Sequence, residues 1–213
     1  MQTQFKQTVS AMCTRAALAL VLAAGAGAAS AGTLHVAIDT SKFGPATGYI
    51  DMNLSASSGV PLATAVVDHM VGFDGTAFID SWGVTNMPGG YAFRNDVAND
   101  LFHAVDFGGV LKFDLTFAGE PDPLTSYVSH FAVSAFDGDG FTPLGHYDPV
   151  TGALADFTWT PATTVQGQGI IGGTVSDPAV TAVPEPAGYL LAGIGLAALA
   201  LGRRRGGRGG ACA

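Results

Sequence analysis

Strict alternation of apolar and polar residues marks the middle of the chain. In residues 110–118, Leu111, Phe113, Leu115 and Phe117 alternate with polar or small residues. A period of two is the pattern of a β-strand with one buried face. The same pattern, in shorter form, predicts strands at residues 32–41, 49–56, 63–73, 78–84, 127–136 and 154–160.

Turn residues separate these predicted strands. The sequences Pro-Gly-Gly at 88–90 and Asp-Gly-Asp-Gly at 137–140 are typical chain reversals. Residues 94–105 carry three apolar side chains at helical spacing, so we expect a loop or a short helix there. Seven or eight short strands with little helix predict an all-β fold, an antiparallel β-sandwich of the jelly-roll type.

The N-terminus has the features of an export signal. Lys6 and Arg15 come before an apolar run over residues 16–29, and Ala29-Ser30-Ala31 supplies small residues at cleavage-site spacing. This pattern predicts a signal peptide over residues 1–31, cleaved before Gly32. An uncleaved anchor is the alternative, although the apolar run is short for a membrane span.

The C-terminus combines an apolar run with a basic cluster. The 16 uncharged residues 187–202 are followed by Arg203, Arg204 and Arg205. As a helix they reach about 24 Å, short of a hydrocarbon core of about 30 Å. Long arginine side chains extend that reach, and their charge is the positive-inside signal. We therefore predict one short transmembrane helix, with a buried helix followed by a basic tail as the alternative.

Pro184, Glu185 and Pro186 stand immediately before this run. The order of Pro-Glu-Pro, short apolar helix and arginine cluster resembles the PEP-CTERM sorting signal of Gram-negative bacteria, over residues 184–213. The resemblance implies recognition of Pro-Glu-Pro by an exosortase, a membrane-embedded processing enzyme. It also implies a transient anchor in the inner membrane, followed by delivery to the cell surface or extracellular matrix. Residues 35–41, 111–117 and 131–144 look like a recurrent family of such secreted proteins, which are β-rich and have no established activity.

Charge and cysteine positions limit the function of the part between the two signals. Its only lysines and arginines are Lys42, Arg94 and Lys112, whereas 16 of the 17 acidic residues lie there. Such an acidic surface disfavours nucleic-acid binding. Both cysteines, Cys13 and Cys212, fall in the terminal signals, so we expect no disulfide. We assign residues 32–165 to the β-domain and residues 166–183 to a Gly-, Thr- and Pro-rich spacer.

No catalytic constellation is visible, and we predict that the protein is not an enzyme. The five histidines have no metal-binding spacing, and no nucleophile motif is present. A hydrolase built on a carboxylate pair remains a third hypothesis, after the two below. Asp137 and Asp139 are candidate Ca²⁺ ligands, with a simple hairpin turn as the alternative.

Two functions therefore follow from the sequence. The first is an exported surface or matrix protein without a cofactor. The second is a carbohydrate-binding module, with Ca²⁺ as a candidate assisting ion and exopolysaccharide as partner. The aromatic residues that would stack on sugars are Trp82, Tyr91, Tyr127, Tyr147 and Trp159.

Overall fold

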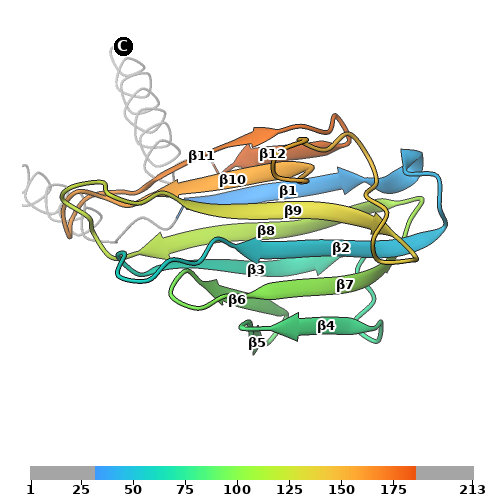
Figure 1. Ribbon diagram of the computed structural model, residues 1–213, viewed down its shortest axis with the longest axis horizontal. Coiled ribbons are helices and arrows are strands. Elements are labelled where there is room, and N and C mark those ends of the chain that lie inside the picture. The colour runs from blue at the N-terminus through green and yellow to red at the C-terminus, as the bar shows by residue number, and fades with distance from the viewer. Residues whose placement is uncertain (1–31, 186–213) are drawn as a thin grey trace, which may run out of the picture. The chain divides into compact units, whose positions relative to one another are not determined.

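Two antiparallel six-stranded sheets form the domain in the computed structural model, which describes residues 32–185 (Figure 1). Sheet A contains β12 (Val180–Pro184), β1 (Gly32–Asp39), β8 (Val110–Gly119), β3 (Ala63–Val71), β6 (Gly90–Arg94) and β5 (Thr85–Met87), in that order. Sheet B contains β11 (Ile170–Val175), β10 (Ala155–Thr160), β9 (Ser129–Asp137), β2 (Thr47–Leu54), β7 (Asp100–Asp106) and β4 (Ile79–Trp82). A 3-10 turn, η1 (Thr40–Lys42), follows β1. The predicted all-β antiparallel fold is confirmed.

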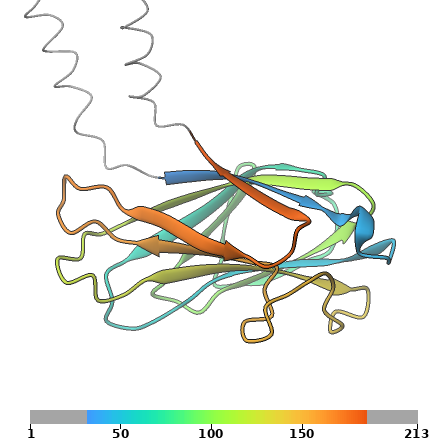
Figure 2. The ribbon, with the colours of Figure 1, turned by 90° about the horizontal axis from the view of Figure 1, so that it is seen from above.

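The first eight strands have jelly-roll order. Strands β1-β8-β3-β6 of one sheet are layered against β2-β7-β4 of the other, as Figure 2 shows from above. β5 departs from that order, because it pairs with β6 through a hairpin instead of extending β4. Strands β9, β10 and β11 then widen sheet B beyond β2, and β12 widens sheet A beyond β1.

Aromatic side chains from both sheets meet in the core. Phe117 of β8 packs edge-on against Phe131 of β9, with ring centroids 6.3 Å apart, and stacks on Trp159 of β10 at 6.0 Å. Phe93 of β6 contacts Phe131 edge-on at 5.1 Å. All four rings are 3% exposed or less. The alternation seen in the sequence therefore produces the buried layer between the sheets.

The prediction of a loop or short helix at residues 94–105 is wrong in its second half. This part is strand β7, which pairs with both β2 and β4. Its buried residues are Leu101, His103 and Val105, so the period is two. The alternation is hard to recognise in the sequence because a histidine occupies one of the core positions. Burial lowers the pKa of His103, and its Nδ1 lies 2.7 Å from the carbonyl oxygen of Ala104.

Two buried asparagines hold the segment before β7. Asn95 Oδ1 accepts a hydrogen bond from the N–H of Ala63 (2.8 Å), and its Nδ2 donates to the carbonyl of Pro61 (3.0 Å). Asn99 Oδ1 accepts from the N–H of Leu54 (2.7 Å), and its Nδ2 contacts three main-chain carbonyl oxygens at 2.9 Å. These side chains supply hydrogen-bond partners to main-chain groups that have no partner on a neighbouring strand.

We expect the substitution Asn99→Ala to lower the free energy of unfolding by about 1–3 kcal/mol, because the N–H of Leu54 would stay buried without an acceptor. Denaturant unfolding measures the change. Asn86→Ala, at an exposed position of β5, is the matched control. A loss for Asn99→Ala no larger than that of the control would contradict this role.

The predicted spacer at residues 166–183 is also wrong. β11 pairs along its whole length with β10, and β12 pairs along its whole length with β1. Val180 is buried, and so is Asp177, whose carboxylate accepts hydrogen bonds from the N–H groups of His146 and Ala179. The β-domain therefore extends to residue 185, beyond the predicted boundary at 165.

Several predicted features lie outside the described residues. They are the signal peptide with Ala29 and Ala31, the apolar run 187–202, Pro186, and the cluster Arg203, Arg204 and Arg205. Within residues 32–185, no helix has the length and apolar character that a membrane span requires.

Candidate functional site

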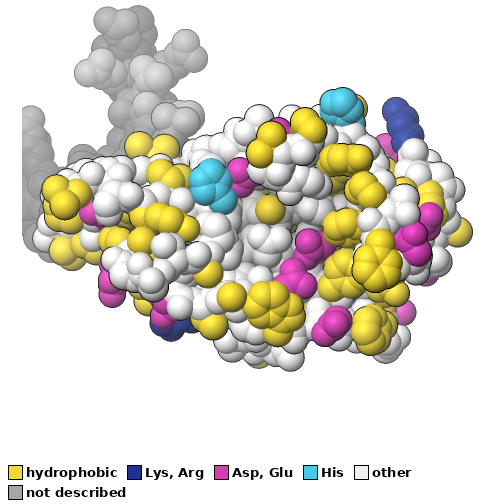
Figure 3. Space-filling model, viewed as in Figure 1, with side chains coloured by type: hydrophobic (Ala, Val, Ile, Leu, Met, Phe, Trp, Pro, Cys, Tyr) yellow, Lys and Arg dark blue, Asp and Glu magenta, His cyan; other side chains and the backbone are white. Residues whose placement is uncertain are grey.

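A groove with a volume of about 480 Å³ crosses the outer face of sheet B. Strands β2, β9 and β10 form its floor, and the loop between β9 and β10 forms a wall. Figure 3 shows this face, with carboxylate side chains along its middle and exposed hydrophobic side chains on both sides. The polar floor residues are Asp51, Asn53, Ser55, His130, Ser134 and Asp156.

Two carboxylates on the floor each have a buried oxygen without a protein partner. These atoms are Oδ1 of Asp51 and Oδ1 of Asp156. The other oxygen of Asp156 lies 2.8 Å from Nδ1 of His130. Buried carboxylate oxygens are normally hydrogen-bonded, so two buried oxygens without a partner are an unusual feature of this floor.

The pKa of Asp51 lies well above the ordinary value of an aspartate. Burial, together with a hydrogen bond to the Asp100 carboxylate and the repulsion between the two groups, raises the pKa of Asp51 to about 8. The two residues occupy diagonal positions on neighbouring strands, β2 and β7, which brings their side chains together. The two carboxyl groups are therefore joined by one hydrogen bond beneath the groove.

This shift gives stability a specific pH dependence. Because the pKa of Asp51 is higher in the folded chain than the ordinary 3.8, the folded state binds more protons between about pH 4 and 8. The free energy of unfolding should therefore fall as pH rises through this window, by at most about 1.4 kcal/mol per pH unit from this residue. Denaturant unfolding of wild type and Asp51→Asn across the window measures it.

The difference between the two proteins isolates Asp51 from other groups. The pKa of His35 is also raised, chiefly by its hydrogen bond to Asp114, and that residue remains in both proteins. We expect Asp51→Asn to flatten the slope and to gain stability relative to wild type towards pH 8. Parallel curves for the two proteins would contradict the shift.

Exposed aromatic rings line the groove. Phe141 is 86% exposed and Tyr147 is 40% exposed, and both belong to the loop between β9 and β10. Large exposed rings beside a polar floor suit a ligand with both apolar faces and hydroxyl groups.

The predicted aromatic platform is not assembled as a unit. Trp159 is buried in the core. Tyr91 is partly buried and packs against the core cluster. Trp82 is exposed, but on β4 at the opposite edge of sheet B from β10. The hydroxyl of Tyr127 lies 3.3 Å from Oγ of Ser55, at the end of the groove. Of the five predicted residues, only Tyr147 lines the groove.

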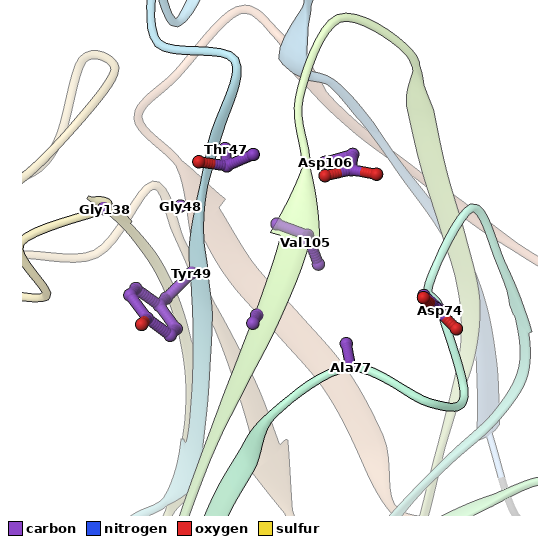
Figure 4. Close-up of a pocket in the computed structure, with 9 residues that line it drawn as sticks. Thr47, Gly48, Tyr49, Asp74, Ala77, Val105, Asp106 and Gly138 are labelled. Atoms are coloured by element: carbon purple, nitrogen blue, oxygen red, sulfur yellow. The ribbon is translucent and has the colours of Figure 1, made fainter.

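A smaller cavity of about 230 Å³ lies near the ends of β2 and β7. In Figure 4, Tyr49 lies on one side of β7 and Asp74 on the other, with small side chains between them. Both the N–H and the hydroxyl of Thr76 donate to Asp74 Oδ1 at 2.8 Å, which lowers the pKa of Asp74. Asp74 is already hydrogen-bonded and is separated from Tyr49 by β7, so this cavity is a weaker candidate than the groove.

Asp137 and Asp139 stabilise the turn that follows β9. Asp139 accepts hydrogen bonds from the N–H groups of Phe141 and Thr142 and from the hydroxyl of Thr142, which lowers its pKa. Asp137 Oδ1 accepts from the N–H of Gly138 at 2.6 Å. The turn is present as the alternative interpretation expects, and the Ca²⁺ site stays a prediction.

The segment containing Pro184 and Glu185 is part of the folded domain. Pro184 is the last residue of β12, an edge strand, where a missing N–H is tolerated. The N–H of Glu185 donates to the carbonyl of Thr33 at 3.0 Å. Oε1 of Glu185 lies 3.6 Å from Nε2 of His35. The two ends of the described chain are therefore hydrogen-bonded to each other.

Residues 182–205 match the PEP-CTERM protein-sorting motif. The motif supports sorting by an exosortase, with export and a membrane-anchored intermediate before delivery to the surface. Its first four residues, 182–185, are those seen at the end of β12 and just beyond it. No curated protein and no solved structure matches the chain significantly.

Sequence reasoning missed the floor of the groove. Asp51 and Asp156 stand at outward positions of predicted strands, between buried neighbours, and this is a usable signal. The sequence does not reveal the order of the strands: β2 is far from β9 and β10 in the chain but lies next to β9 in the sheet.

Proposed function

Because residues 182–205 carry the PEP-CTERM motif, we propose that this chain is an exported surface or matrix protein without catalytic activity of its own. An exosortase recognises Pro184, Glu185 and Pro186 while the C-terminal segment is held in the inner membrane. Cleavage then frees the β-domain from its anchor. The observation that carries this proposal is the motif match, which begins within the last strand of the domain.

The positions of the two chain ends support removal of both signals. β1 begins at Gly32, so cleavage before this residue leaves the strand complete. β12 ends at Pro184, so cleavage beyond Glu185 leaves that strand complete as well. Both cuts lie next to the Glu185–Thr33 hydrogen bond and remove no part of the core. The domain can therefore fold before or after processing.

Fractionation of the producing cells tests this proposal. In cells with an active exosortase, an antibody against the domain should detect it on the surface or in the medium. In cells without that enzyme, the protein should stay in the membrane fraction. Equal release from both strains would contradict the proposed route.

A second function, binding of carbohydrate, is favoured by the groove on sheet B. Its floor carries polar side chains that can hydrogen-bond to sugar hydroxyls, among them Asn53, Ser55 and Asp156. It also offers the exposed rings of Phe141 and Tyr147 to the apolar faces of sugars. Its volume of about 480 Å³ falls within the range of small-molecule sites, about 300–1,000 Å³. A matrix polysaccharide is the corresponding partner.

Pull-down with insoluble polysaccharides and a glycan array test this second function, with and without Ca²⁺. Asp156→Asn and Tyr147→Ala should each weaken binding. Asp80→Asn, at an exposed position of β4 outside the groove, should not. The absence of binding under both conditions, or an equal effect of the control, would exclude the groove as a sugar site.

A further inference from the structure

Two histidines and three carboxylates gather on the outer face of sheet A. They are His35 on β1, Asp68 and His69 on β3, Asp114 on β8, and Glu185 after β12. β8 lies between β1 and β3, and the register places His35 and Asp68 directly opposite Asp114 on its two sides. Asp114 is therefore the centre of this group.

Both oxygens of Asp114 contact an imidazole nitrogen. Oδ1 lies 2.6 Å from Nδ1 of His35, and Oδ2 lies 3.2 Å from Nδ1 of His69. The same nitrogen of His69 lies 3.0 Å from Oδ1 of Asp68. One ligand atom each from Asp68, His69 and Asp114 thus falls within 4.8 Å of the others.

An irregularity in β3 brings His69 into this group. Ala63, Ala65 and Val67 are buried, so strict alternation would direct His69 to the core as well. Instead the pairing with β8 shifts register between Asp68 and Val71, and His69 adopts a left-handed backbone with φ of 50°. Consecutive residues, Asp68 and His69, consequently both lie near Asp114 on the outer face.

We propose that Asp68, His69 and Asp114 bind a divalent transition-metal ion, with Zn²⁺ as the representative. Metal–ligand bonds of about 2.0–2.2 Å place tetrahedral ligand atoms roughly 3.3–3.6 Å apart. The nitrogen of His69 lies slightly closer than this to the two carboxylate oxygens, at 3.0 and 3.2 Å, and all three ligand atoms lie within 4.8 Å of one another. Three protein ligands leave a fourth position open to water. An imidazole among the ligands favours zinc, copper, nickel or iron over calcium and magnesium.

His35 orients Asp114 in this site. Its Nδ1 holds Oδ1 of Asp114, which leaves Oδ2 directed toward His69. Its other nitrogen faces Glu185 at 3.6 Å, so the site connects through His35 to the first part of the sorting motif. Removal of an outer residue that fixes a ligating carboxylate commonly lowers metal affinity by 10- to 100-fold.

Calorimetric titration with ZnCl₂ tests the proposal on the full chain in detergent. The protein carries no histidine tag and is first stripped with a chelator. Cys13→Ser and Cys212→Ser are present in every sample, because free thiolates bind zinc. We expect one zinc ion per chain and a higher unfolding midpoint with zinc than without it.

His69→Asn is the decisive variant. Asparagine tolerates a left-handed backbone as histidine does, so the fold is retained while the imidazole is lost. We expect it to weaken zinc binding by at least about tenfold, and His35→Gln to weaken it by about 10- to 100-fold without changing the stoichiometry. His146→Asn, which replaces an exposed loop histidine, should titrate like wild type.

Each contrary result overturns the assignment. Absence of zinc binding would leave the cluster as two hydrogen-bonded His–Asp pairs. Equal titrations for wild type and His69→Asn would place any bound zinc elsewhere. Tighter binding of Ca²⁺ than of Zn²⁺ would contradict the proposed class of metal.

Discussion

A domain that ends at residue 165 should fail to fold, whereas one that ends at residue 185 should fold and unfold cooperatively. Removal of β11 and β12 strips the main-chain partners from β10 and β1. It also removes buried Val180 and the carboxylate of Asp177, which fixes the loop at His146. Domains are stable by only about 5–15 kcal/mol, so the loss of two of twelve strands exceeds what this one can tolerate.

Three secreted forms make this test graded. They start at Gly32 and end at residues 165, 176 and 185, so the middle form retains β11 and lacks β12. Circular dichroism during heating should show a full transition for the longest form, a lowered midpoint for the middle form, and no cooperative transition for the shortest. A midpoint for the shortest form within a few degrees of the longest would show that β11 and β12 are dispensable.

Replacement of Pro184, Glu185 and Pro186 by alanine should abolish processing while leaving the domain folded. Pro184 and Glu185 are exposed at the edge of sheet A. The contact of Glu185 with His35 lies at the surface, where such pairs add little stability. An effect on processing would then reflect recognition rather than unfolding.

Thr181→Ala supplies the control for this experiment. Thr181 is exposed on β12 and stands just before the residues that match the motif. Immunoblots of cell fractions should show the unprocessed triple variant in the membrane and the processed control outside it. If the triple variant were released as wild type is, the Pro-Glu-Pro sequence would not be the recognition element.

The sequence predicts most strands that bury one full face and misses three of the four edge strands, β5, β11 and β12, together with the interior strands β6 and β7. β8 alternates because Leu111, Phe113, Leu115 and Phe117 all enter the core. β11 has no buried residue and β12 has only Val180, so their pairing rests on main-chain hydrogen bonds that leave no apolar pattern. β7 was hidden for a different reason, the buried His103 within its apolar face.

The candidate sites depend on adjacency that one strand alone cannot reveal. The groove combines β2, β9 and β10, and the proposed metal site combines β3 and β8 with support from β1. The position of His69 depends further on a local register shift, which reverses the side expected from alternation. The sorting motif is the opposite case, because its residues are consecutive and can be read directly.

Intact mass of the protein recovered from cells, with and without the exosortase, tests the central claim most directly. The account predicts a product that begins at Gly32 and ends close to Glu185 only when the enzyme is present. Because β12 ends at Pro184, such a product keeps the complete domain. A mass that still includes residues 187–213 in both strains would contradict exosortase processing and leave a permanently anchored surface protein.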